Sequence, residues 1–390
     1  MVVRRLAPPW RARLGARRHG YHEPVRESSL AERLIAYDTS SLEGMRAAAE
    51  FVKGWLESRD VEVSDATHNG RPLLAATVGA EEGPTVVLHG HVDVVPAPPE
   101  QFRPRVEGDR LVGRGAYDMK GALAAMMCAT RDLAEQQGVR VHLLCVSDEE
   151  SDESGERGSD ALVERGYHGD FAITGEPTEL RIGVQAKGVL GVRLEVTGKA
   201  AHGSTPWLGD NAVVKALDVY EQVRAMPFAR ESSELFDRPS INLGRIAGGD
   251  ALNKVPDRCV VDVDIRYLPG QDPGEIFEAI DSLPGVSASE LIHRDPVTVD
   301  ARNPYVRTLA EVVARGMSAD RMSVGRDGAS DAVSFLEAGV PAVEFGPEGG
   351  GHHGPDEWVS ISSLERYRTA LVEFVRLVPE RLGRARLHVA

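Results

Sequence analysis

Cysteine is scarce in this sequence, and a long apolar run is missing. The three cysteines among 390 residues lie far apart with no C-x-x-C spacing, which argues against a disulfide framework and a thiolate metal site. Each lies in an apolar stretch, so we expect Cys128, Cys145 and Cys259 to be small buried side chains in a reducing cytoplasm. No window reaches the ~18 consecutive apolar residues of a transmembrane helix, so we expect no membrane span.

Basic residues are also in short supply. Lysine and arginine number 45 against 60 acidic residues, which gives a formal net charge of −15. Such a charge repels phosphate backbones and anionic lipid headgroups, so we expect neither nucleic acid nor a membrane as partner. The chain exceeds the ~100 to 200 residues that are usual for one domain, so the sequence predicts two domains.

The first 26 residues differ in composition from everything that follows. They carry seven arginines and contain no acidic residue before Glu23. Because they lack an apolar core segment, they do not resemble a secretory signal. We interpret residues 1–26 as a disordered extension or a misplaced start, and an Arg-rich targeting segment is the alternative.

The rest of the chain alternates strand and helix patterns. Apolar runs at 85–89, 141–146 and 171–174 alternate with helical spacing, which is typical of α/β folds with a mostly parallel sheet flanked by helices. From 185 to 296 the order is strand, helix, two strands and helix, which resembles a small inserted α+β ferredoxin-like domain. We therefore predict a catalytic domain formed by residues 27–184 and 297–390, with an inserted dimerisation or lid domain at 185–296.

Polar side chains follow the predicted strands. His91 and Asp93 come directly after the run at 85–89, and residues two apart on an extended segment face the same way. In open α/β sheets, ligands bind at the carboxyl ends of the strands. A neutral imidazole is a good zinc ligand, and a neighbouring carboxylate can fix its tautomer. The pair therefore indicates a metal site, although either residue could be an ordinary surface side chain.

Four further clusters of acids or histidines follow. Asp118 precedes a predicted helix and could cap it or bridge two cations. The run Ser147-Asp148-Glu149-Glu150 could be a solvated acidic loop, or could supply a metal ligand and a general base. Together with Glu176 and His353, these clusters form an oxygen and imidazole set that suits zinc without any thiolate.

In their order along the chain, these motifs resemble those of one family of dinuclear zinc hydrolases. It is the group that contains aminoacylase, carboxypeptidase G, acetylornithine deacetylase and succinyl-diaminopimelate desuccinylase. The matching stretches are His-Val-Asp at 91–93, Gly-Arg-Gly-x-x-Asp-Met-Lys-Gly at 113–121, Asp-Glu-Glu at 148–150, Gly-Glu-Pro at 175–177 and His-Gly-Pro-Asp-Glu at 353–357. They span nearly the whole chain after the first 26 residues.

The resemblance implies a role for each cluster. There would be two zinc ions, for which cobalt or manganese could substitute. His91 and Glu176 would bind one ion, Glu150 and His353 would bind the other, and Asp118 would bridge the two. Glu149 would act as general base, and Asp93 would orient His91. Further acids follow Glu150, so a shifted register of the base and the ligand stays open.

The inserted domain matches the family as well. Gly-Lys-Ala-Ala-His-Gly-Ser-x-Pro at 198–206 resembles a loop whose histidine, here His202, reaches a neighbouring subunit's active site to stabilise an oxyanion. This implies a homodimer, whereas an ordinary loop histidine is the alternative. Arg266 could bind a substrate carboxylate, or could pair with Asp262 or Asp264. The positions that resemble substrate-binding residues are Asn253, Arg266, Gly328 and Ser330.

We therefore hypothesise a cytoplasmic zinc-dependent amidohydrolase of amino-acid metabolism. It would cleave the amide of an N-acyl amino acid, of the acetylornithine or succinyl-diaminopimelate kind, through a hydroxide that bridges two zinc ions. The nearest competing hypothesis is a dipeptidase, aminopeptidase or carboxypeptidase of the same family. The chain could also be a catalytically silent metal-binding scaffold or a single-metal hydrolase.

Overall fold

A computed structural model describes residues 26–150, 156–316 and 324–386 of the chain. The predicted N-terminal extension therefore lies outside the described residues, apart from Arg26. Among the residues described, no helix has both the length and the apolar character needed to cross a membrane.

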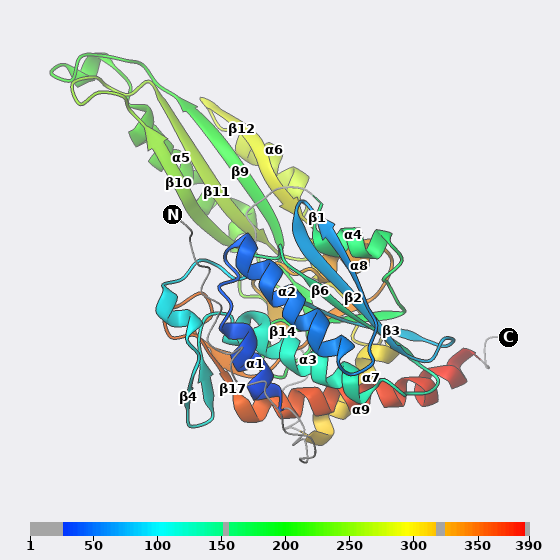
Figure 1. Cartoon of the computed structure of the whole chain (residues 1–390). Coiled ribbons are helices and arrows are strands. Elements are labelled where there is room, and N and C mark those ends of the chain that lie inside the picture. The colour runs from blue at the N-terminus through cyan, green and yellow to red at the C-terminus, as the bar shows by residue number, and fades with distance from the viewer. Residues whose placement is uncertain (1–25, 151–155, 317–323, 387–390) are drawn as a thin grey trace, which may run out of the picture.

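A nine-stranded sheet forms the centre of the larger part of the molecule (Figure 1). Its order is β1-β2-β6-β3-β7-β15-β8-β13, with β14 beside β8. The central strands β6, β3, β7 and β15 are parallel, so their carboxyl ends meet at one edge. The strands are β1 (Val63–His68), β2 (Arg71–Gly79), β3 (Thr85–His91), β6 (Arg140–Val146), β7 (Phe171–Thr174), β8 (Gly183–Ala186), β13 (Val297–Thr298), β14 (Val324–Arg326) and β15 (Ala342–Glu344).

Helices cover both faces of this sheet, as the sequence predicts. On β3, His89 faces Ser159 and Phe335, whereas the next residue, Gly90, faces Met119 and Leu123. One face therefore carries α4 and α8, and the other carries α3 with α1 and α9 packed on it. The helices are α1 (Glu27–Ile35), α2 (Leu42–Glu57), α3 (Gly121–Asp132), α4 (Gly158–Glu164), α7 (Pro304–Gly316), α8 (Ala332–Glu337) and α9 (Ile361–Arg386).

A small antiparallel sheet brings the C-terminal glycine-rich loop next to the segment before α3. Its order is β16-β17-β5-β4, and β17 pairs with β5 through Val359 and Leu111. A π-helical turn, η3 (Ala116–Lys120), leads from β5 into α3. The strands are β4 (Arg105–Glu107), β5 (Arg110–Val112), β16 (Gly349–Gly350) and β17 (Trp358–Ser360).

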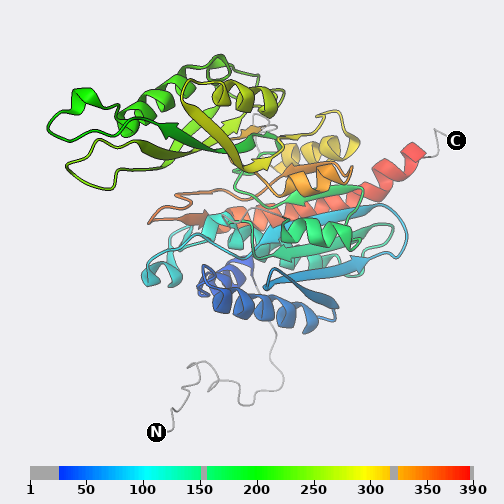
Figure 2. The ribbon, with the colours of Figure 1, turned by 90° about the horizontal axis from the view of Figure 1, so that it is seen from above.

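The residues between β8 and β13 form a separate antiparallel sheet with two helices, which projects from the larger part (Figures 1 and 2). The strand order is β10-β11-β9-β12, and the unit has its own hydrophobic core. The alternating burial along β11 and the second half of β9 follows their alternating apolar residues. The elements are β9 (Gly188–Thr197), α5 (Ala212–Ala225), β10 (Ser240–Gly248), β11 (Arg258–Tyr267), α6 (Pro273–Asp281) and β12 (Val286–Arg294).

The mixed α/β class with an inserted α+β unit is confirmed, although the elements differ in detail from the sequence-based expectation. The final strand of the insert, β12, was missed, because its polar and exposed residues weaken the apolar alternation. The last helix, α9, continues through Pro379 to Arg386. The limits of the domains at 184 and 296 stay a prediction.

Candidate metal centre and substrate cleft

His91 ends β3 and is completely buried. Its Nδ1 lies 3.0 Å from the carbonyl oxygen of Asp93 and 3.5 Å from that residue's Oδ1, so Asp93 fixes the ring orientation. The other nitrogen, Nε2, lies 3.3 Å from Asp118 Oδ1 and 3.9 Å from Glu176 Oε1. The backbone N–H of Glu150 donates to Asp93 Oδ2 over 2.9 Å, so one carboxylate braces two chain segments of the site.

Asp118 lies between two groups of possible ligands. Its Oδ2 lies 3.6 Å from His353 Nε2, and that nitrogen lies 2.9 Å from Glu150 Oε1. In each group the ligand atoms all lie within 4.8 Å of one another, and Asp118 belongs to both. The structure thus brings the five predicted ligands together in the predicted grouping. The two groups are His91, Asp118 and Glu176, and Asp118, Glu150 and His353.

These residues fit a pair of divalent cations. Two imidazoles and three carboxylates converge, and Glu176 Oε1 is buried with no hydrogen-bond partner among the described residues. Hydrogen bonds to Asp118 and Glu150 raise the pKa of His353 to about 10, and burial raises the pKa of Glu149 to about 8. Crowded buried carboxylates hold protons in this way unless cations offset their charge.

Glu149 lies beside the ligands without belonging to either group. It lines a cleft of about 790 Å³ together with Asp118, Glu150, Glu176 and His353. The cleft lies between the carboxyl edge of the parallel strands and the insert, since residues of β9, β11 and β12 also line it. Glu149 is therefore a carboxylate that lines the cleft beside two groups of possible metal ligands.

A buried ion pair behind the ligands was missed by sequence reasoning. Arg114 Nη1 lies 2.7 Å from Glu357 Oε2, and both side chains are almost fully buried. Glu357 Oε1 accepts the backbone N–H groups of Tyr117 and Asp118 over 3.0 and 3.1 Å, and Arg114 Nη2 donates to the carbonyl of His353 over 3.1 Å. The pair therefore holds the backbone of two predicted ligands, Asp118 and His353. The only sequence signal was the position of both residues within the quoted motifs.

The insert contributes one predicted residue to this cleft and keeps two away from it. Arg266 lines the cleft, and its Nε donates to Asp264 over 2.9 Å, the pairing considered as its alternative. His202 and Asn253 are exposed, and neither lines the cleft of this chain. They follow β9 and β10, whose far ends form the outer tip of the insert in Figure 1.

The loop before α8 divides its predicted residues between the cleft and the core. Gly328 lines the cleft with Ala329. Ser330 is buried and accepts the backbone N–H of Ala332 over 3.1 Å, so its hydroxyl faces the first turn of α8. Of the two, Gly328 is the one placed to face a substrate.

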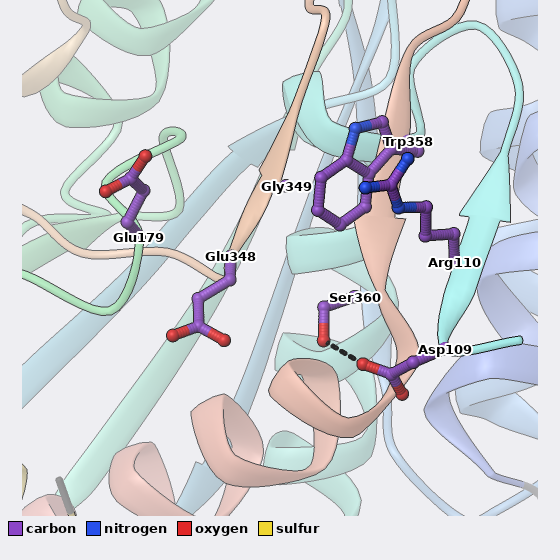
Figure 3. A pocket seen from close by; sticks show the side chains of 7 residues that line it. All are labelled: Asp109, Arg110, Glu179, Glu348, Gly349, Trp358 and Ser360. Carbon is purple, nitrogen blue, oxygen red and sulfur yellow. Dashed lines mark hydrogen bonds between the residues drawn. The ribbon is translucent and has the colours of Figure 1, made fainter.

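A second cavity, of about 440 Å³, lies beside the small sheet (Figure 3). On one side the guanidinium of Arg110 lies 4.2 Å above the Trp358 ring, and on the other lie Glu179 and Glu348. The Ser360 hydroxyl donates to Asp109 over 2.6 Å. None of the predicted site residues lines this cavity.

Comparison with known proteins gives consistent results. The model of peptidase family M20/M25/M40 matches residues 87–377. An acetylornithine deacetylase of Myxococcus xanthus is 31% identical over 382 residues, covering 90% of this chain and 97% of that protein. An M20 family metallo-carboxypeptidase of Sulfolobus solfataricus superposes with a TM-score of 0.74 at 21% identity, covering 91% and 99% of the two chains. A dinuclear metal-binding M20 peptidase of Bacillus subtilis superposes with a TM-score of 0.64 at 16% identity, covering 91% of this chain and 98% of that chain.

Proposed function

The chain belongs to peptidase family M20/M25/M40 and is therefore a hydrolase of amide or peptide bonds, and from that premise we propose that it deacylates an N-acyl amino acid with two zinc ions as cofactor. The observation that carries the proposal is the place of Asp118 in both ligand groups. The Myxococcus deacetylase, which matches most of both chains, supports an N-acyl amino acid of the acetylornithine kind.

The residues of the cleft divide the work of amide hydrolysis. The two cations, held by the ligands named above, would supply Lewis acidity and lower the pKa of a water. Glu149 takes the proton of the attacking water and passes it to the leaving amine. Asp93 keeps Nε2 of His91 directed at the centre. The insert residues in the cleft wall close one side of the substrate space and restrict water there.

The direct test is hydrolysis of a panel of N-acetyl amino acids, N-succinyl amino acids and dipeptides, with and without a chelator. We expect at least one N-acyl amino acid to be cleaved, activity to disappear on chelation, and two equivalents of Zn²⁺, Co²⁺ or Mn²⁺ to restore it. Cleavage of dipeptides alone would identify a peptidase. Full activity at one equivalent of metal would identify a single-metal enzyme. No activity at two equivalents would identify a catalytically silent scaffold.

We also propose a homodimer in which the tip of the insert reaches the partner's cleft. His202 forms an isolated bridge with Lys254, so its loop and the loop of Asn253 lie side by side at the tip. Large apolar side chains are exposed there, with relative accessibilities of 76% for Trp207 and 105% for Leu252. The two side chains belong to the loops that this bridge joins, and apolar side chains that gather on one surface are typical of a protein interface.

Mixed dimers would test the shared site. His202→Ala should lower kcat by about 10²- to 10³-fold, because it removes one oxyanion donor. Mixing it with Glu149→Gln should recover up to about a quarter of the wild-type activity, because one intact site forms in each mixed dimer. If His202 acted within its own chain, the mixture would be as inactive as its components.

We propose a reducing compartment, the cytoplasm, as its location. The cysteines Cys128, Cys145 and Cys259 are all free and buried in the structure. Burial raises the pKa of Cys145 to about 12, so its thiol stays protonated and unreactive. Thiols of this kind serve as small apolar side chains in proteins that use no disulfides.

A further inference from the structure

A group of buried polar side chains lies behind the cleft and has no part in the reaction described above. Ser159 donates its hydroxyl to Asp331 Oδ2 over 2.5 Å, and His89 Nε2 lies 2.8 Å from that hydroxyl oxygen. His89 and Ser159 are inaccessible to solvent, and Asp331 is 3% exposed. Because the hydroxyl proton points to the carboxylate, His89 donates through Nε2, and the hydrogen bonds run from His89 through Ser159 to Asp331.

Arg157 connects this group to the turn that carries Glu149. Its Nη1 donates to the carbonyl oxygen of Asp148 over 3.0 Å and to the carbonyl oxygen of Glu149. The same nitrogen lies 4.0 Å from Asp331 Oδ1. Asp148 in turn accepts the backbone N–H of Gly158 over 2.7 Å, so the start of α4 and the turn hold each other.

The Asp331 carboxylate is thus the point at which several elements meet. It lies at the N-terminus of α8 and faces His89 of β3, Ser159 of α4 and Arg157 just before α4. Gly328 and Ala329 of the cleft wall lie three and two residues before it in the chain. A buried carboxylate is stable only with compensating donors. Its charge therefore helps to hold both the turn that carries Glu149 and the loop that carries Gly328 and Ala329.

We propose that Asp331 is a positioning residue for hydrolysis. It acts through Arg157 on the backbone of Glu149, and it fixes the loop of Gly328 and Ala329 before α8 relative to that backbone. The inference rests on the proposed function, since it assumes that Glu149 is the base. Asp331 is buried and is not among the residues that line the cleft, so its removal acts through the groups that it holds. A purely structural role would instead affect folding, metal content, KM and kcat together.

The first test is Asp331→Asn in the full-length enzyme reconstituted with two equivalents of Zn²⁺. Asparagine keeps the size of the side chain and its acceptor for Ser159, but removes the charge that faces Arg157. We expect kcat to fall about 10- to 100-fold, because a small displacement of a catalytic group costs about that much. KM should change less than about threefold, and two zinc ions should stay bound.

Arg157 variants show whether the effect passes through the guanidinium. Arg157→Met should lower kcat by a similar factor, Arg157→Lys should restore part of it, and the double variant of Asp331→Asn with Arg157→Met should fall no further than Arg157→Met alone. The matched control is Asp65→Asn, which removes an exposed carboxylate 2.7 Å from Lys53 and should leave kcat unchanged.

A readout without turnover separates this inference from the proposed function. In protein loaded with two equivalents of Co²⁺, Asp331→Asn should change the visible absorption spectrum, because Glu150 follows Glu149 on the same turn. The positioning role would be overturned if kcat and the spectrum were unchanged, or if the effects in the double variant were additive. It would also be overturned if KM rose in parallel with a loss of bound metal and of thermal stability. If the wild type hydrolyses nothing in the panel, the proposed function fails and the Co²⁺ spectrum alone decides.

Discussion

Replacing Glu149 with glutamine should lower kcat by about 10²- to 10⁴-fold, the usual contribution of a general base. The amide keeps the size of the side chain but accepts no proton at neutral pH. Glu149 lies outside both groups of ligand atoms, so the variant should still bind two metal ions. Steady-state kinetics and metal analysis of the same preparation measure both parts of this expectation.

Glu150 provides the matched control, since it is the same residue type one position further along. Its Oε1 lies 2.9 Å from His353 Nε2, within the group that also contains Asp118. Glu150→Gln should therefore weaken binding of one metal ion, and added metal should restore part of the activity. Loss of metal from Glu149→Gln with full occupancy in Glu150→Gln would show that the two roles are exchanged.

The ligand clusters could be predicted from the sequence because each one follows a short apolar strand. A parallel sheet brings its strand ends to one edge whatever the connections between them, so local patterns were sufficient to predict that His91 and Glu176 lie together. The helix-capping alternative for Asp118 is wrong. The cap position of α3 is Lys120, and Asp118 lies in η3 before it.

The supporting residues could not be predicted because their partners are remote in the chain. Glu357 lies 243 residues from Arg114, and Asp331 lies 172 residues from Ser159. No spacing rule reports such contacts, and arginine and aspartate are ordinary surface residues in the absence of coordinates. The short strand β8 was missed for a related reason, since its pairing comes from neighbours that the local sequence does not specify.

Removing the Glu357 carboxylate should be the most destabilising single change near the site. Glu357→Ala leaves Arg114 charged and buried without its partner, and it deprives two backbone N–H groups of their acceptor. Breaking a buried ion pair in this way costs about 3–5 kcal/mol. Because the two N–H groups belong to Tyr117 and Asp118, metal affinity should fall as well. Denaturant unfolding with and without Zn²⁺ measures both effects.

An exposed pair gives the scale for this loss. Arg258 Nη2 lies 2.6 Å from Glu195 Oε2 on the insert, where the two side chains are 64% and 44% exposed, so Glu195→Ala should cost less than about 1 kcal/mol. Changing both members of the buried pair to methionine should recover part of the stability lost in Glu357→Ala, because no uncompensated charge is left inside. The double variant should still bind metal poorly, since the backbone of Asp118 has lost its acceptor. Wild-type stability and metal content in Glu357→Ala would mean that the backbone of the bridging ligand needs no such support.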